Sequence, residues 1–151
     1  MKEIERKFLV KNMDFLKNHS TVGYTIQQAY LMESKDRSLR VRIKNQRAFL
    51  TLKIGENALE RSEYEYEIPF KEAEELLHCC PRVLYKIRYE IHYQNALWEV
   101  DVFQKELTGL CIAEIELESP EQSFDLPEWV GEEVTQDPQY LNINLIKRLN
   151  V

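Results

Sequence analysis

The first ten residues place two carboxylates and an amine along one side of an extended segment. Side chains alternate between the two faces of a strand, so Glu3, Glu5 and Lys7 share a face opposite Ile4 and Phe8. Carboxylates two residues apart on a strand lie roughly 6–7 Å apart, close enough to share one hard metal ion or hold two neighbouring ones. The lysine in the same row would meet an anion held by that metal.

Later segments repeat this alternation, and they sort the charges by sign from one segment to the next. Arginine and lysine occupy the polar face of three segments, with Arg40 and Arg42 in 38–44, Lys53 in 48–54, and Lys86 and Arg88 in 82–93. The segment 111–119 is acidic instead, with Glu114, Glu116 and Glu118. Two other segments place acidic groups on their polar face, with Glu63 and Glu65 beside Arg61 in 61–68 and Asp101 in 97–103. This sorting predicts a basic wall that faces an acidic wall.

About eight strands with short turns predict a mainly β fold of the α+β class, with antiparallel pairing. One architecture is an open sheet with helices on one face and water on the other. The other is a closed eight-stranded barrel whose interior holds the charged side chains and a small ligand. The helices expected near 13–18 and over 71–78 are few and short, which favours the closed barrel.

The end of the chain predicts one more helix, which would plug one mouth of the barrel. Asp137 is a capping carboxylate and Pro138 suits the first helical position. Leu141, Leu145 and Leu149 then follow at helical spacing and form an apolar stripe.

Composition limits the class of protein and its partners. A length of 151 residues fits a single domain spanning 1–151, and a net charge of −6 argues against a nucleic-acid surface. No apolar run approaches the roughly 20 residues of a membrane span, and charges from Lys2 onward argue against a signal peptide. Three cysteines without metal spacing favour reduced thiols and a cytoplasmic location.

A basic wall that faces an acidic wall suits a polyphosphate that binds together with a metal ion. Arginine and lysine bind phosphate oxygens directly. Carboxylates hold Mg²⁺ or Mn²⁺, which in turn binds phosphate. The sequence has no glycine-rich phosphate loop, so side chains must provide these contacts.

Seven motifs in this order resemble the CYTH superfamily of triphosphate tunnel metalloenzymes, over nearly the whole chain. They are Glu3-Ile-Glu5-Arg-Lys7, Leu39-Arg-Val-Arg42, Leu52-Lys53, Arg61-Ser-Glu63-Tyr-Glu65, Lys86-Ile-Arg88, Glu99-Val-Asp101 and Ala113-Glu-Ile-Glu116. The resemblance implies a closed antiparallel eight-stranded tunnel that takes a triphosphate. It implies Mg²⁺ or Mn²⁺ as cofactor, held by Glu3, Glu5, Asp101, Glu114 and Glu116. It implies phosphate contacts from Lys7, Arg40, Arg42, Lys53, Arg61, Lys86 and Arg88. Glu63 and Glu65 would bind a second metal or orient the attacking water, and with Lys7 and Arg42 they form the expected catalytic set.

The substrate stays open among the activities of this family. A short chain leaves few loops for reading a base or a thiazole, which favours hydrolysis of inorganic tripolyphosphate to diphosphate and phosphate. A class IV adenylate cyclase, a nucleoside or thiamine triphosphatase, and a non-catalytic polyphosphate-binding module are the alternatives. A small-molecule partner is expected in each case, without nucleic acid or membrane, and exposed tyrosines or strand edges would support a homodimer.

Overall fold

The computed structural model describes residues 2–16, 22–57 and 59–149, and strands make up most of them. These strands are β1 (Lys2–Val10), β2 (Tyr24–Ser34), β3 (Arg37–Lys44), β4 (Arg47–Ile54), β5 (Glu60–Ile68), β6 (Leu84–Tyr93), β7 (Ala96–Phe103), β8 (Cys111–Leu117) and β9 (Val130–Glu133). The α-helices are α1 (Phe70–His78) and α2 (Asn142–Ile146), and single 3₁₀ turns cover Asp14–Leu16, Lys105–Leu107 and Pro138–Tyr140.

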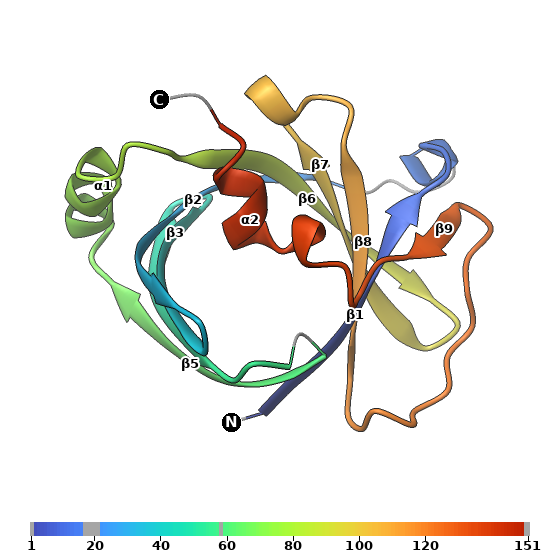
Figure 1. The fold of residues 1–151 in the computed structure, drawn as a ribbon. Helices are drawn as coiled ribbons and strands as arrows, with labels where there is room; N and C mark the ends of the chain where they lie inside the picture. Colours follow the sequence, from blue (N-terminus) through green and yellow to red (C-terminus); the bar gives the residue numbers. More distant parts are fainter. Residues whose placement is uncertain (1, 17–21, 58, 150–151) are drawn as a thin grey trace.

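Eight of the strands form a closed antiparallel ring, as predicted (Figure 1). The strand order is β5-β4-β3-β2-β6-β7-β8-β1, and β5 pairs back onto β1 where Glu3 faces Arg61. The far end of the same β1 edge pairs with β9 instead. β1 therefore closes the ring with its first residues and anchors the C-terminal segment with its last ones.

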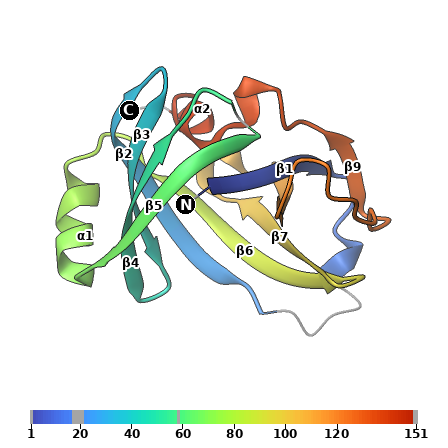
Figure 2. The same ribbon diagram turned by 90° about the horizontal axis from the view of Figure 1, so that it is seen from below.

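The apolar face of the ring points outward and is covered there, which confirms the closed architecture over the open sheet. Helix α1 covers the outer face of β2, β3 and β4, where Ala73 and Leu77 pack in one buried cluster with Val41 (Figure 2). A second buried cluster lies outside β1, β7 and β8 and includes Phe8 and Trp98. Because most apolar strand residues pack on the outside, the alternation of each strand leaves the charged residues inside.

Helix α2 lies at one end of the ring (Figures 1 and 2), but it begins later than the sequence predicts. The Asp137 carboxylate does accept a hydrogen bond from the Gln139 backbone N–H at 3.2 Å, yet it caps only the 3₁₀ turn over Pro138–Tyr140. Leu141 is extended, with φ −68° and ψ 136°, and interrupts the helix before Asn142. Leu145 and Leu149 are buried as expected.

Three further elements differ from the sequence-based expectation. A polar turn is expected over residues 33–36, but β2 runs on to Ser34, which pairs with Arg37, and only two residues connect the strands. β9 was not predicted, because four residues after a proline-rich loop carry too little alternation to recognise. The helix expected near 13–18 is a 3₁₀ turn over Asp14–Leu16, and its last two expected residues lie outside the described part. Among the described helices, none is long and apolar enough to cross a membrane.

Candidate active site

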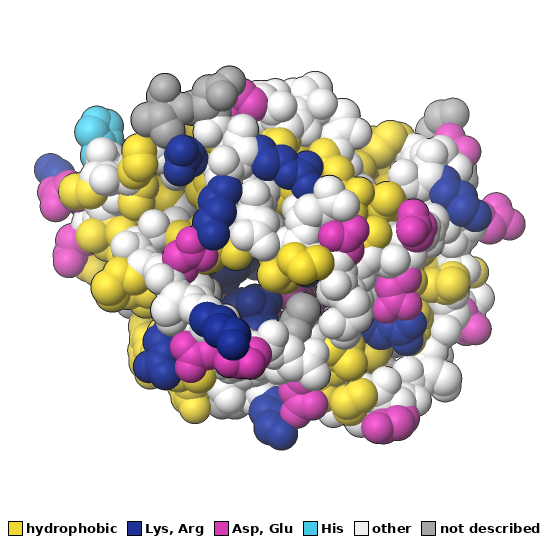
Figure 3. Space-filling view, viewed as in Figure 1, with side chains coloured by type: hydrophobic (Ala, Val, Ile, Leu, Met, Phe, Trp, Pro, Cys, Tyr) yellow, Lys and Arg dark blue, Asp and Glu magenta, His cyan; other side chains and the backbone are white. Residues whose placement is uncertain are grey.

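A cavity of about 270 Å³ opens inside the ring, and its walls carry most of the residues that the sequence singles out. The space-filling view shows the hollow with basic and acidic side chains at it (Figure 3). Residues Leu141 to Asn144 close part of its rim, as expected of a plug. The predicted site residues on its wall are Glu3, Glu5, Lys7, Arg40, Arg42, Lys53, Arg61, Glu63, Arg88, Glu114 and Glu116.

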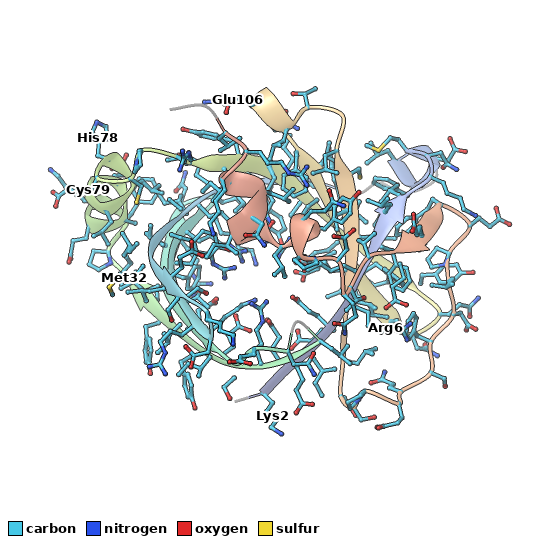
Figure 4. All side chains as sticks on the ribbon, in the orientation of Figure 1. Lys2, Arg6, Met32, His78, Cys79 and Glu106 are labelled. Carbon is cyan, nitrogen blue, oxygen red and sulfur yellow. The ribbon has the colours of Figure 1, made fainter. Side chains whose placement is uncertain are left out.

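The direction of the side chains follows from strand parity. Many side chains with nitrogen or oxygen tips project from the strands into the ring, whereas the labelled Met32, His78 and Cys79 lie at the periphery (Figure 4). Arg42 and Lys86, which belong to the predicted basic wall, are buried rather than exposed on an outer surface. The charged face is therefore the interior of the ring.

Three predicted residues, Asp101, Lys86 and Glu65, are not on the cavity wall. Register places Asp101 opposite Arg88, which donates from Nε and Nη2 to its two oxygens at 2.7 and 2.8 Å. Lys86 Nζ donates to the same carboxylate at 2.6 Å. Burial opposes ionisation of Asp101, but Arg88 and Lys86 outweigh it and hold its pKa far below the usual range. Asp101 is thus a buried counter-ion behind the basic wall, separate from the other predicted metal ligands.

The basic wall carries positive charge that nearby carboxylates only partly balance. Arg42 is buried, and the structure shows no ion pair for it among the described residues. Burial and the positive charges of Arg40 and Arg88 lower the pKa of Arg42 to about 9. Arg40 donates to the hydroxyl of Thr51 at 3.2 Å and lies 3.8 Å from Glu65. A dianionic or more highly charged ligand would relieve this repulsion.

On the opposite wall the carboxylates come from β1 and β8, and each ion pair there crosses between strands. Lys53 Nζ lies 2.7 Å from Glu3 Oε1, and Lys7 Nζ lies 3.4 Å from Glu114 Oε1. Arg61 lies 3.6 Å from Glu5. Burial would raise the pKa of Glu5, but Lys53 and Lys7 lower it on balance. These pairs place a lysine or arginine against each of Glu3, Glu5 and Glu114 inside the cavity.

Two of the carboxyl groups share a proton. Burial and a hydrogen bond with Glu3 raise the pKa of Glu63 to about 8. Burial acts against ionisation of Glu3 too, but the hydrogen bond with Glu63 and the charge of Lys53 lower its pKa to about 2. Partial burial and the negative charges of Glu3 and Glu99 raise the pKa of Glu116. This wall therefore holds more carboxylates than its own cations neutralise.

This donor set fits a hard divalent cation. In the part of the chain that the structure describes, no three acidic, histidine or cysteine side chains converge as a complete metal cage. Mg²⁺ does not need one, because it commonly binds through one or two carboxylates together with water and substrate phosphates. Carboxylate oxygens crowded on one wall are the donors that such a cation prefers.

Some residues on or behind the wall were not predicted. Gln28 and Thr51 hold Arg42 and Arg40, and Glu99 and Tyr30 line the cavity. Thr51 has a recognisable signal, because it shares the strand face of Lys53. Gln28 has a weaker signal, as a polar residue that shares its strand face with Ile26 and Tyr30.

Comparison with known proteins relates this architecture to characterised relatives. A family model described as "CYTH domain" matches residues 1–149. A protein of Acetivibrio thermocellus named inorganic triphosphatase is 46% identical over 148 residues, covering 97% of this chain and 94% of its own. A Nitrosomonas europaea protein of the same name is 38% identical over 147 residues, covering 94% and 95%. A crystal structure of an inorganic triphosphatase superposes with a TM-score of 0.72 at 33% identity, covering 99% and 97%.

Proposed function

Because the chain belongs to the CYTH domain family, we propose that it is an inorganic triphosphatase that splits tripolyphosphate into diphosphate and phosphate. One observation carries the proposal: the cavity wall holds Arg42, which has no ion pair among the described residues, together with a group of crowded carboxylates. A basic side and an acidic side of one cavity suit a chain of phosphates, with a metal ion between the phosphates and the carboxylates. The names of the two curated relatives agree with this chemistry.

The basic residues bind and orient the phosphates. Arg42 has no ion pair among the described residues, Arg40 and Arg88 lie close enough to lower its pKa, and Lys53 lines the same cavity. These cations are fixed before substrate arrives, so they stabilise the charge that moves onto the leaving diphosphate without reorganising. Lys7 and Arg61 reach the cavity from the acidic side and contact the phosphates there.

The acidic residues hold the metal. Glu3, Glu5, Glu114 and Glu116 would bind Mg²⁺ or Mn²⁺, and we leave Asp101 out because Lys86 and Arg88 occupy its oxygens. A bound metal would neutralise phosphate charge and help to generate the nucleophile.

The two glutamates of β5, Glu63 and Glu65, have different roles in activating the attacking water. Glu63 lies on the cavity wall and shares a proton with Glu3, so one of its oxygens can receive a proton from water once that shared proton is lost. Glu65 accepts a hydrogen bond from Thr51 at 3.0 Å, and through it supports the position of Arg40. We assign proton transfer to Glu63 and a supporting role to Glu65.

Inorganic triphosphate fits the cavity better than a nucleotide or thiamine triphosphate. Tyr30 is the one aromatic side chain among the described residues on the cavity wall, so a base or thiazole would have a single ring to stack on and no second ring to enclose it. The experiment incubates the purified chain with tripolyphosphate, ATP or thiamine triphosphate, with Mg²⁺ or Mn²⁺. Equal amounts of diphosphate and phosphate from tripolyphosphate support the proposal. Cyclic AMP from ATP would indicate a cyclase, and binding without turnover a non-catalytic module.

We also propose that the enzyme works without nucleic acid and as a homodimer. Tyr64 and Tyr66 point outward from β5, with 41% and 63% of each residue exposed, and offer an aromatic surface for a second copy. Light scattering of the wild type and of a Tyr64→Ser, Tyr66→Ser double variant tests this assembly. A wild type that is already monomeric at micromolar concentration would refute it.

A further inference from the structure

Arg42 is held by a neutral partner, and that choice of partner preserves its charge. Its Nε donates to Gln28 Oε1 at 3.0 Å, and the two residues are direct cross-strand neighbours in the register of β2 and β3. The arginine Nε is only a donor, so the oxygen of the amide must face it. This contact uses the inner edge of the guanidinium and leaves its terminal nitrogens for a ligand.

The side chain of Gln28 makes no other hydrogen bond among the described residues. It is fully buried, and its Nε2 has no hydrogen-bond partner in the part of the chain that the structure describes. It does not line the cavity, so it is a residue behind the binding wall rather than a contact of the substrate. Burying an amide whose N–H groups have no partner costs folding free energy. Within the described part of the chain, the contact with Arg42 is the one interaction of this side chain that can offset that cost.

A carboxylate at the same place would hold Arg42 equally well but would cancel its charge. Elsewhere in the ring the structure does use acids, as where Asp101 holds Lys86 and Arg88. We therefore propose that Gln28 is a positioning residue that aims Arg42 at the triphosphate and, by being neutral, leaves its positive charge for the substrate. This inference rests on the proposed function of the cavity.

The test replaces the amide by its charged isostere. Gln28→Glu keeps the shape and the acceptor, so we expect the protein to fold with an unchanged or higher melting temperature. The new carboxylate pairs with Arg42, and we expect KM for tripolyphosphate to rise at least about tenfold. Metal-free tripolyphosphate binding, measured by calorimetry in EDTA, should weaken by a similar factor.

Gln27→Glu is the matched control, because Gln27 precedes Gln28 on β2 and its side chain points to the outer face. It adds the same charge to the chain and should leave KM within about twofold of the wild type. A second variant, Gln28→Met, removes the acceptor without adding charge. It should lower kcat/KM about tenfold through lost aiming, with a smaller loss of metal-free binding than Gln28→Glu.

The outcomes separate the inference from the proposed function. If the wild type does not hydrolyse tripolyphosphate, the proposed function fails, and metal-free binding still tests Gln28. If the wild type is active and Gln28→Glu binds and turns over tripolyphosphate like Gln27→Glu, the inference is wrong. Gln28→Met with wild-type kinetics would overturn the aiming role. If Gln28→Glu does not fold, Gln28→Met decides alone.

Discussion

Asp101 offers the sharpest test of how the basic wall is built, because Asp101→Asn removes one charge and almost no volume. The wild-type carboxylate accepts three charge-assisted hydrogen bonds from Lys86 and Arg88, at 2.6, 2.7 and 2.8 Å. All three side chains are almost completely buried. Breaking a buried pair in this way costs about 3–5 kcal/mol. Asparagine keeps one hydrogen-bond acceptor, and Arg88 keeps its ion pair with Glu99 at 3.2 Å. We therefore expect Asp101→Asn to lower the free energy of unfolding by about 3 kcal/mol.

The assay is urea unfolding followed by tryptophan fluorescence, since Trp98 is fully buried and Trp129 nearly so. A loss of about 3 kcal/mol corresponds to a melting temperature lower by about 6–12 °C in a chain of this size. Asp125→Asn, the same change at an exposed position, is the control and should cost less than about 0.5 kcal/mol. Asp101→Asn with near wild-type stability but a much higher Mg²⁺ requirement would refute the counter-ion role and make Asp101 a metal ligand.

Three further predictions follow from the structure. Between about pH 4.5 and 8 the folded chain keeps the Glu63 proton that the unfolded chain releases, so this group makes the free energy of unfolding fall as pH rises. Urea unfolding should show a flatter pH dependence for Glu63→Gln, and an unchanged slope would contradict the shared proton. Gly23→Ala should cost about 1–3 kcal/mol by the same method, because its Cβ would lie 2.6 Å from Ile87 Cγ2 and 2.7 Å from the Tyr89 ring. EDTA should stop tripolyphosphate turnover and excess Mg²⁺ restore it, and turnover that persists in EDTA would exclude a metal requirement.

The sequence predicts the ring and most of its wall because strand alternation decides which side chains share a face. Once Val41 and Phe8 must pack outside, Arg42 and Lys7 must point inside, whatever the order of the strands. What alternation cannot give is the cross-strand register. Asp101 looks like another metal ligand in sequence, and only its position opposite Arg88 shows that it is neutralised.

Two further features escape prediction for local reasons. The start of α2 depends on Leu141, whose backbone is extended, so the helix begins only at Asn142 although the apolar spacing of the leucines includes Leu141. Gln28 is a neutral residue, so a search for charged ligands passes over it. Its hydrogen bond to Arg42 is visible only when β2 and β3 are paired.

The most direct test of the whole account is a crystal structure of the chain with tripolyphosphate and Mn²⁺, in which anomalous scattering locates the metal. We predict that the phosphates lie inside the ring against Arg42 and Arg88, and that the metal lies between them and the carboxylates of β1 and β8. Phosphates bound on the outer surface, or a metal away from Glu3, Glu5, Glu114 and Glu116, would contradict it.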